Sequence, residues 1–149
     1  MQQATTARAP THLWIVGILS LIWNCFGAYD YTMTRMRNLD YLASMGGDPN
    51  VMLAYIDGMP IYAQLGWGLG VWGALLGSVL LLMRSRFAVH AFALSLLGAV
   101  VSFGAQYLGP PPPPEMTAGA LKYMPLVIIG LAAAQLWYAN MVRKDGVLR

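Results

Sequence analysis

Four long apolar segments constrain this chain more than any other feature of its sequence. A helix needs about 20 mostly apolar residues to cross the hydrocarbon core of a bilayer. Such segments occupy residues 13–33, 61–83, 87–108 and 123–142. Because backbone polar groups in lipid must be satisfied within the protein, each segment is expected to be a helix. The sequence therefore predicts an all-α, polytopic membrane four-helix bundle, with residues 1–149 forming a single membrane domain.

The charge content agrees with a chain that lies mostly in lipid. Only 10% of the 149 residues are charged, whereas a soluble domain usually has about 25%. A net charge of +3 would be a weak indication of nucleic-acid binding in a soluble protein. Here the basic residues lie at the ends of the predicted spans, so we expect the lipid bilayer, and no nucleic acid, as a partner.

The first two connections are expected to differ in length and structure. Residues 84–86 form a minimal turn, which predicts a tight antiparallel hairpin of the second and third spans. Residues 34–60 form an external segment, in which the first helix is expected to continue to residue 45 and to stop at Gly46-Gly47. Asp48 and Pro49 then start a short helix over residues 49–57. The segment is predicted to be a short external helical hairpin across the mouth of the bundle.

The third connection, residues 109–116, contains five consecutive prolines. Such a run adopts a stiff polyproline II helix, and we interpret it as a rigid linker between spans. Thr117 is the expected N-cap of the last helix, and Pro125 is expected to lie inside that helix and to kink it.

The distribution of lysine and arginine predicts the orientation in the membrane. Six of these residues lie on the side that holds both termini, and three lie on the other side. The six are Arg8, Arg84, Arg86, Arg143, Lys144 and Arg149, and the three are Arg35, Arg37 and Lys122. The positive-inside rule then places both termini in the cytoplasm.

Small residues recur at helical spacing on three of the spans. Such residues let helices approach closely in lipid, where helix association depends on packing. The second span has Gly66, Gly70, Ala74 and Gly77, the third has Ala91, Ser95, Gly98 and Ser102, and the fourth has Gly130, Ala133 and Ala134. These faces either hold the bundle together or dock a second subunit, and the two interpretations are compatible.

Asp30 is the acidic residue that falls inside a predicted span. A carboxylate in a membrane helix is costly and needs a partner. Arg37, two turns further along the same face, is the nearest candidate cation. Asp30 is either a proton- or cation-binding group or part of an Asp–Arg or Asp–Tyr clasp that fixes the outer end of the bundle. We favour the clasp.

Other polar residues fall at defined depths. Asn24 lies mid-membrane, where an amide usually hydrogen-bonds across helices. Gln64 and Gln106 lie at the same outer level on neighbouring spans and, with Asp30 and Tyr31, are predicted to line a shallow polar pocket.

The residues do not assemble into a familiar catalytic pattern. The sequence has no phosphate-binding loop, no nucleophile elbow and no paired-cysteine metal site. His12 and His90 lie at one level on separate spans, but they are better explained as interfacial residues than as haem ligands. We therefore expect no enzyme activity, catalytic residue, cofactor or metal.

Four stretches of the chain carry a family resemblance. They are Trp23-Asn24-x-x-Gly27-Ala28-x-Asp30-Tyr31, the glycine-rich segment 67–78, the Arg84/Arg86 turn, and residues 93–98. In these the chain resembles a group of uncharacterised small four-span proteobacterial inner-membrane proteins, some of which carry the label "sugar transporter". The resemblance implies a bacterial inner membrane and identifies no site residue.

The leading functional prediction is a non-catalytic accessory or structural subunit. The many small-residue faces and the few ionisable groups favour a protein that packs against further copies of itself or within a larger membrane-protein complex. The alternative is a component of an oligomeric small-solute transporter or channel, with Asp30 and the outer glutamines lining the path. A lipid or quinone site between helices is a third option.

Overall fold

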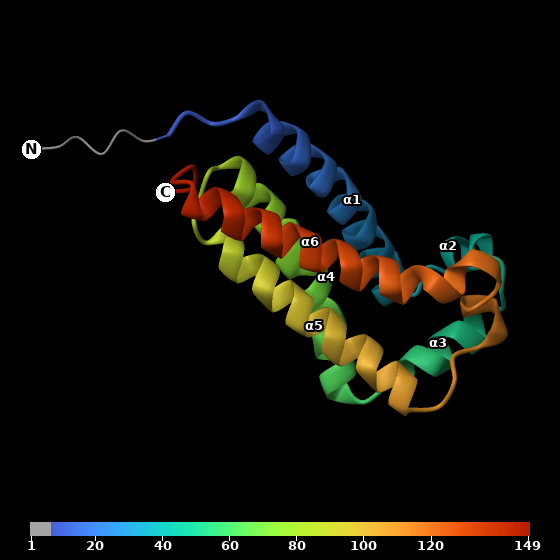
Figure 1. Cartoon of the computed structure of the whole chain (residues 1–149). Helices are drawn as coiled ribbons and strands as arrows, with labels where there is room; N and C mark the ends of the chain where they lie inside the picture. Colours follow the sequence, from blue (N-terminus) through green and yellow to red (C-terminus); the bar gives the residue numbers. More distant parts are fainter. Residues whose placement is uncertain (1–6) are drawn as a thin grey trace, which may run out of the picture.

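The computed structural model describes residues 7–149, so the first six residues of the predicted domain lie outside it. Four long helices pack side by side, and short helices cover one end of the bundle (Figure 1). Residues 7–149 contain no strand, and the predicted all-α bundle is confirmed. The long helices are α1 (Thr11–Arg35), α4 (Ile61–Leu82), α5 (Ala88–Leu108) and α6 (Met124–Lys144).

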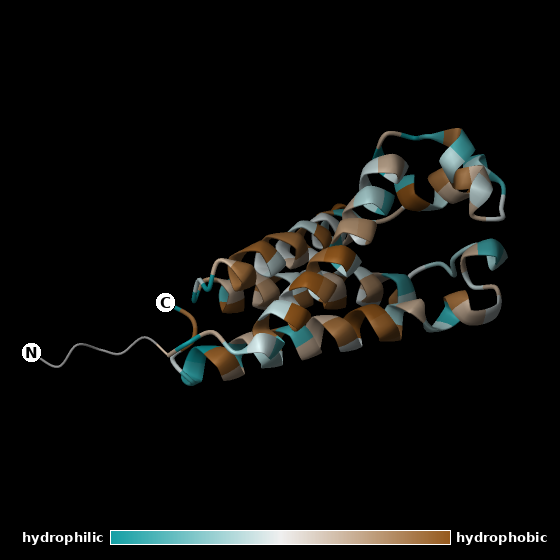
Figure 2. Cartoon of the chain, turned by 90° about the horizontal axis from the view of Figure 1, so that it is seen from above, coloured by the Kyte–Doolittle hydropathy of each residue, from teal (hydrophilic) through white to brown (hydrophobic). Residues whose placement is uncertain are grey.

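All four predicted segments form helices that are long and apolar enough to cross a membrane, as in a multi-pass membrane protein. Figure 2 shows apolar residues along these helices and many of the hydrophilic ones near the two ends of the bundle. Helix α4 packs between α1 and α5, and α6 packs on the other side of α5. Helices α1 and α6 are therefore the two outermost members of the series, and a seam lies between them.

The α4–α5 pair is held together by glycine. A Cβ atom added at Gly98 would lie 2.5 Å from the Gly66 carbonyl oxygen and 2.7 Å from the Gly70 nitrogen. One turn further, Ser95 Oγ donates to the Gly70 carbonyl at 2.6 Å, and the Phe92 ring lies against Gly77. The two backbones are thus in direct contact along the small residues of both helices.

The first helix ends earlier than the sequence suggested. The prediction that it continues through residue 45 is wrong, because Arg37 adopts a left-handed conformation with φ 56°. The Asn38 N–H then bonds to the Met33 carbonyl at 3.1 Å, which is a Schellman ending. The Asn38 side chain also accepts from the Tyr41 N–H at 3.0 Å and so caps the separate helix α2 (Leu39–Ser44).

Helix α3 (Pro49–Asp57) begins where the sequence placed it. Asp48 Oδ1 accepts from the Asn50 N–H at 2.9 Å, and Pro49 occupies the first turn. Helices α2 and α3 enclose a small apolar cluster of Leu42, Met52 and Leu53, against which Met116 packs. The short helices and the linker before α6 thus form one cap on the end of the bundle that lies away from the C-terminus. This end is called the outer end below.

The proline linker does not lead directly into the last helix. Pro113 has polyproline-like dihedral angles, but two 3-10 turns follow, η1 (Pro114–Met116) and η2 (Gly119–Tyr123). Helix α6 starts at Met124, so Thr117 does not cap it. Pro125 lies in its first turn, where proline removes no hydrogen bond. The predicted internal kink is therefore wrong.

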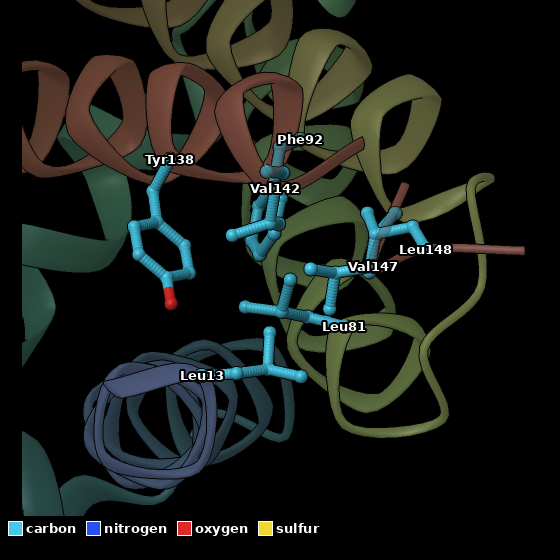
Figure 3. Close-up of a cluster of buried hydrophobic side chains, with 9 residues drawn as sticks. Leu13, Leu81, Phe92, Tyr138, Val142, Val147 and Leu148 are labelled. Atoms are coloured by element: carbon cyan, nitrogen blue, oxygen red, sulfur yellow. The ribbon is translucent and has the colours of Figure 1, made fainter. Parts of the chain in front are cut away.

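The opposite end of the bundle is closed by the C-terminal segment. Figure 3 shows Leu13, Leu81, Phe92 and Val142, one from each long helix, gathered in one core with Val147 and Leu148. The Arg149 N–H donates to the Arg84 carbonyl at 2.7 Å, which holds this segment against the α4–α5 turn.

The described N-terminal segment is held at the same end. Arg84 Nη2 donates to the Ala7 carbonyl at 2.6 Å, and its Nε donates to the Val147 carbonyl at 3.1 Å. A single guanidinium thus ties the segments beside the first and last long helices to the α4–α5 turn.

Candidate functional site

A buried amide joins three helices near the middle of the bundle. Asn24 Nδ2 donates to Ser78 Oγ at 2.7 Å and to the Ala74 carbonyl at 3.0 Å, both on α4. The same nitrogen lies 3.5 Å from Gln135 Oε1 on α6, at the limit of a hydrogen bond. Ser78 in turn donates to the Ala74 carbonyl. Asn24 therefore links α1 firmly to α4 and only weakly to α6, and the Ala74 carbonyl contacts α1.

Side chains bridge the seam between α1 and α6 at two levels. At the end of the bundle where α1 begins, His12 Nδ1 and the Tyr138 hydroxyl lie 2.5 Å apart. Their rings meet edge to face. The Asn24–Gln135 contact is the second bridge. Because both bridges are side-chain contacts, they leave room between the two helix backbones.

The space between α1 and α6 forms a groove of about 400 Å³. Its walls are mostly apolar and come from the two helices that border the seam. The lining residues are Val16, Leu19, Ser20 and Trp23 of α1, with Leu131, Ala134, Gln135, Trp137 and Tyr138 of α6. Ser20 and Gln135 are buried polar residues within this apolar lining, which makes the groove a candidate binding site.

At the outer end, Asp30 is held by a tyrosine. The Tyr41 hydroxyl donates to Asp30 Oδ1 at 2.7 Å. Burial, followed by the hydrogen bond and the negative charge of Asp30, raises the pKa of Tyr41 from 10.0 to about 12. Arg37 does not reach Asp30 and instead pairs with Asp57 at 2.7 Å. Of the two clasps considered, the contact present is the Asp–Tyr one, and it ties α1 to α2.

The remaining outer residues have separate partners. Gln64 accepts from Arg35 at 3.1 Å and donates to the Met59 carbonyl at 3.0 Å. The Tyr31 ring packs edge-on against Trp67, with ring centroids 4.7 Å apart. Gln106 lies half-buried on α5. Within residues 7–149, no hydrogen bond joins any two of the six predicted polar residues, Asn24, Asp30, Tyr31, Arg37, Gln64 and Gln106.

The small residues of α6 have a different environment from those of α4 and α5. A Cβ atom at Gly130 would meet nothing within 4 Å, and Ala133 is exposed. Ala134 lines the groove that faces α1. Gly130 and Ala133 share one exposed face of α6, its outer face, with the large side chains of Leu126 and Trp137, and Trp137 also lines the edge of the groove.

Neither histidine is placed beside the other. His12 is engaged by Tyr138, and His90 packs against Phe87, with ring centroids 5.9 Å apart. In the described part of the chain, no group of three or more His, Cys, Asp and Glu residues is arranged to hold a metal ion. Comparison of the chain with protein-family models, with curated proteins and with solved structures found no match.

Proposed function

We propose that the chain is a non-catalytic accessory or structural subunit of a bacterial inner-membrane complex, and that it docks through the outer face of α6. The observation that carries the proposal is the contrast in small residues. At the α4–α5 interface, Gly66, Gly70 and Gly98 lie against the backbone of the neighbouring helix. Gly130 and Ala133 of α6 are instead open on the surface. Small residues let a helix from another subunit approach closely, which is the main source of helix association in lipid.

The face is also suited to docking by its flanking side chains. Leu126 and Trp137 are exposed on the same side of α6, one turn before Gly130 and one turn after Ala133. Large side chains on both sides of a small-residue depression give a surface that a partner helix can match by packing alone. The partner is either a second copy of this chain or a different membrane protein.

Photo-crosslinking in intact membranes tests this proposal. A diazirine-bearing amino acid at position 133 is expected to yield protein–protein adducts. The matched control is the same amino acid in place of Cys25, which is exposed near the middle of α1. Adducts with lipid alone at both positions would contradict the proposal.

The proposed orientation has both termini in the cytoplasm. The end of the bundle where α1 begins and α6 ends also carries the α4–α5 turn with Arg84 and Arg86 (Figure 1), and retention of positive charge on the cytoplasmic side supports this arrangement. Reporter fusions after residue 149 and within residues 109–116 test it. Cytoplasmic activity of the first and periplasmic activity of the second are expected, and the reverse pattern would refute the orientation.

A further inference from the structure

Two polar side chains in the α1–α6 groove have donor groups without a hydrogen-bond partner. Ser20 is 7% exposed and Gln135 is 9% exposed, and both line the groove. Within residues 7–149, neither Ser20 Oγ nor Gln135 Nε2 makes a hydrogen bond. The fully buried, unpartnered side-chain oxygen in this part of the chain is Glu115 Oε2, in the outer cap. Ser20 Oγ and Gln135 Nε2 therefore open onto the groove.

These groups lie deep in the bundle, where water cannot satisfy them. Helix α1 has 25 residues, and its midpoint is three residues from Ser20; helix α6 has 21 residues, and its midpoint is one residue from Gln135. At a rise of 1.5 Å per residue, these offsets are about 5 Å and about 2 Å. A hydroxyl or amide that has no hydrogen-bond partner in hydrocarbon raises the free energy of the folded chain by up to several kcal/mol. The occupant of the groove is therefore expected to bring a hydrogen-bond acceptor.

Depth decides between two carbonyl-bearing classes of lipid. The ester carbonyls of a phospholipid remain near the polar headgroups, about 15 Å from the midplane of a 30 Å hydrocarbon core. An acyl lipid would bring only its chain to Ser20 and Gln135. An isoprenoid quinone carries its carbonyl groups on an uncharged ring that enters the hydrocarbon, so it can reach both donors.

The walls and the size of the groove fit a planar ring. Trp23 of α1 and Trp137 of α6 both contribute to the lining, and indoles favour offset or edge-on contacts with another ring. A volume of about 400 Å³ lies within the range of small-molecule sites. The groove therefore has room for a substituted ring and the beginning of its tail, which leaves through the lipid-facing opening.

We propose that the groove between α1 and α6 binds an isoprenoid quinone, with a ring carbonyl accepting hydrogen bonds from Ser20 and Gln135. This site and the proposed docking face lie on adjacent sides of α6 and share Trp137, but the two hydrogen-bond donors belong to the groove alone, so each proposal has its own test. Binding involves no electron transfer, and the ring is recognised by shape and by the two donors.

Photo-affinity labelling of the purified full chain in liposomes tests the proposal, with a short-tailed azido-ubiquinone as the probe. Saturable labelling of peptides containing residues 16–23 and 131–138 is expected, with displacement by unmodified short-tailed ubiquinone. In the double variant Ser20→Ala, Gln135→Leu, the affinity is expected to fall about eightfold, because two membrane hydrogen bonds of about 0.6 kcal/mol each are lost. The control Gln64→Leu, outside the groove, is expected to retain full affinity.

A second variant guards against misfolding of the first. Ala134→Phe leaves both donors in place and fills the groove, so labelling of the two helices is expected to disappear while the circular dichroism spectrum is unchanged. Equal affinity in the double variant, labelling without saturation, or equal displacement by diacylglycerol would each overturn the proposal. Protein adducts from a photo-reactive residue at position 131, with no quinone labelling, would assign the groove to a partner's helix instead.

Discussion

The α4–α5 pair and the α1–α6 seam are held together by different kinds of contact. Along α4–α5, glycine brings the backbones into direct contact, and a Cβ atom would clash with backbone atoms at Gly98. Along α1–α6, two side-chain bridges leave a groove of about 400 Å³. The first arrangement gives a hairpin with direct backbone contact, and the second leaves the groove in which we propose that a quinone binds. The difference shows how a small bundle can be rigid on one side and open on the other.

Breaking the tight interface is expected to have the largest effect. In Gly98→Val, the new side chain meets the backbone of Gly66 and Gly70, which cannot move aside as a flexible side chain can. We expect a loss of about 3 kcal/mol, at the upper end for overpacked sites, in unfolding measurements in detergent.

The control for this prediction lies on the same helix. A Cβ atom at Gly104 would meet nothing within 4 Å, so Gly104→Val is expected to change stability by only a few tenths of a kcal/mol, because valine forms helices slightly better than glycine. Equal stabilities for the two variants would mean that α4 and α5 are not in backbone contact.

The buried amide between the two regions is expected to have an intermediate effect. Asn24→Leu removes the hydrogen bonds to Ser78 and Ala74, and bonds of this kind average about 0.6 kcal/mol each in membrane proteins. A loss of about 1 kcal/mol is expected in the same unfolding assay. Asn140→Leu, which removes an exposed contact with Arg143, is the matched control and should leave stability nearly unchanged.

Opening the seam further is expected to have a small effect on stability. Tyr138→Phe removes the hydroxyl that contacts His12, which corresponds to about 0.6 kcal/mol. The change is expected to be local, with faster amide exchange in the first turns of α1 and unchanged exchange in α4 and α5. Uniformly faster exchange in all four helices would show that the seam is as integral to the bundle as the hairpin.

The outer clasp is expected to respond only to strongly alkaline pH. The pKa of Tyr41 is about 12 in the folded chain against an ordinary 10.0. Because the folded-state pKa is raised, the stabilisation is fully present below about pH 10 and is lost as the pH rises to about 12.

The titration of the phenolate absorbance checks this prediction. A component near pH 12 is expected in the native chain and should be missing in Tyr41→Phe. If the two titration curves coincide, Tyr41 is not held by Asp30.

The sequence was sufficient to predict the four long helices, because each span is recognisable by its length and its apolar content. The ends of elements were harder, since they depend on single residues. Arg37 and Arg84 adopt left-handed conformations with φ 56° and 59°, which non-glycine residues rarely do. No residue type signalled that the first helix would stop at Arg35 or that 3-10 turns would precede Met124.

For the candidate site, the polar residues themselves could be predicted from the sequence, but their partners could not. Asn24 was recognisable as a polar residue at mid-membrane depth, and Asp30 as an acid inside a predicted span. Their partners Ser78, Gln135 and Tyr41 were not, because contacts depend on how each helix is rotated and on which helices become neighbours. A helix that is apolar on all sides has no periodic pattern that would fix its rotation. The α1–α6 groove follows from that packing order and was outside the reach of the sequence.

The most direct test of the proposed function is the mass of the particle that surrounds this chain in its native membrane. Membrane patches excised with a polymer, without detergent, can be weighed by native mass spectrometry. The account predicts particles heavier than the 16.2 kDa chain by at least one further protein. It also predicts that Gly130→Leu releases that protein, while Gly104→Leu, at an equally open position on α5, does not. A single 16.2 kDa chain in every native particle would contradict the account.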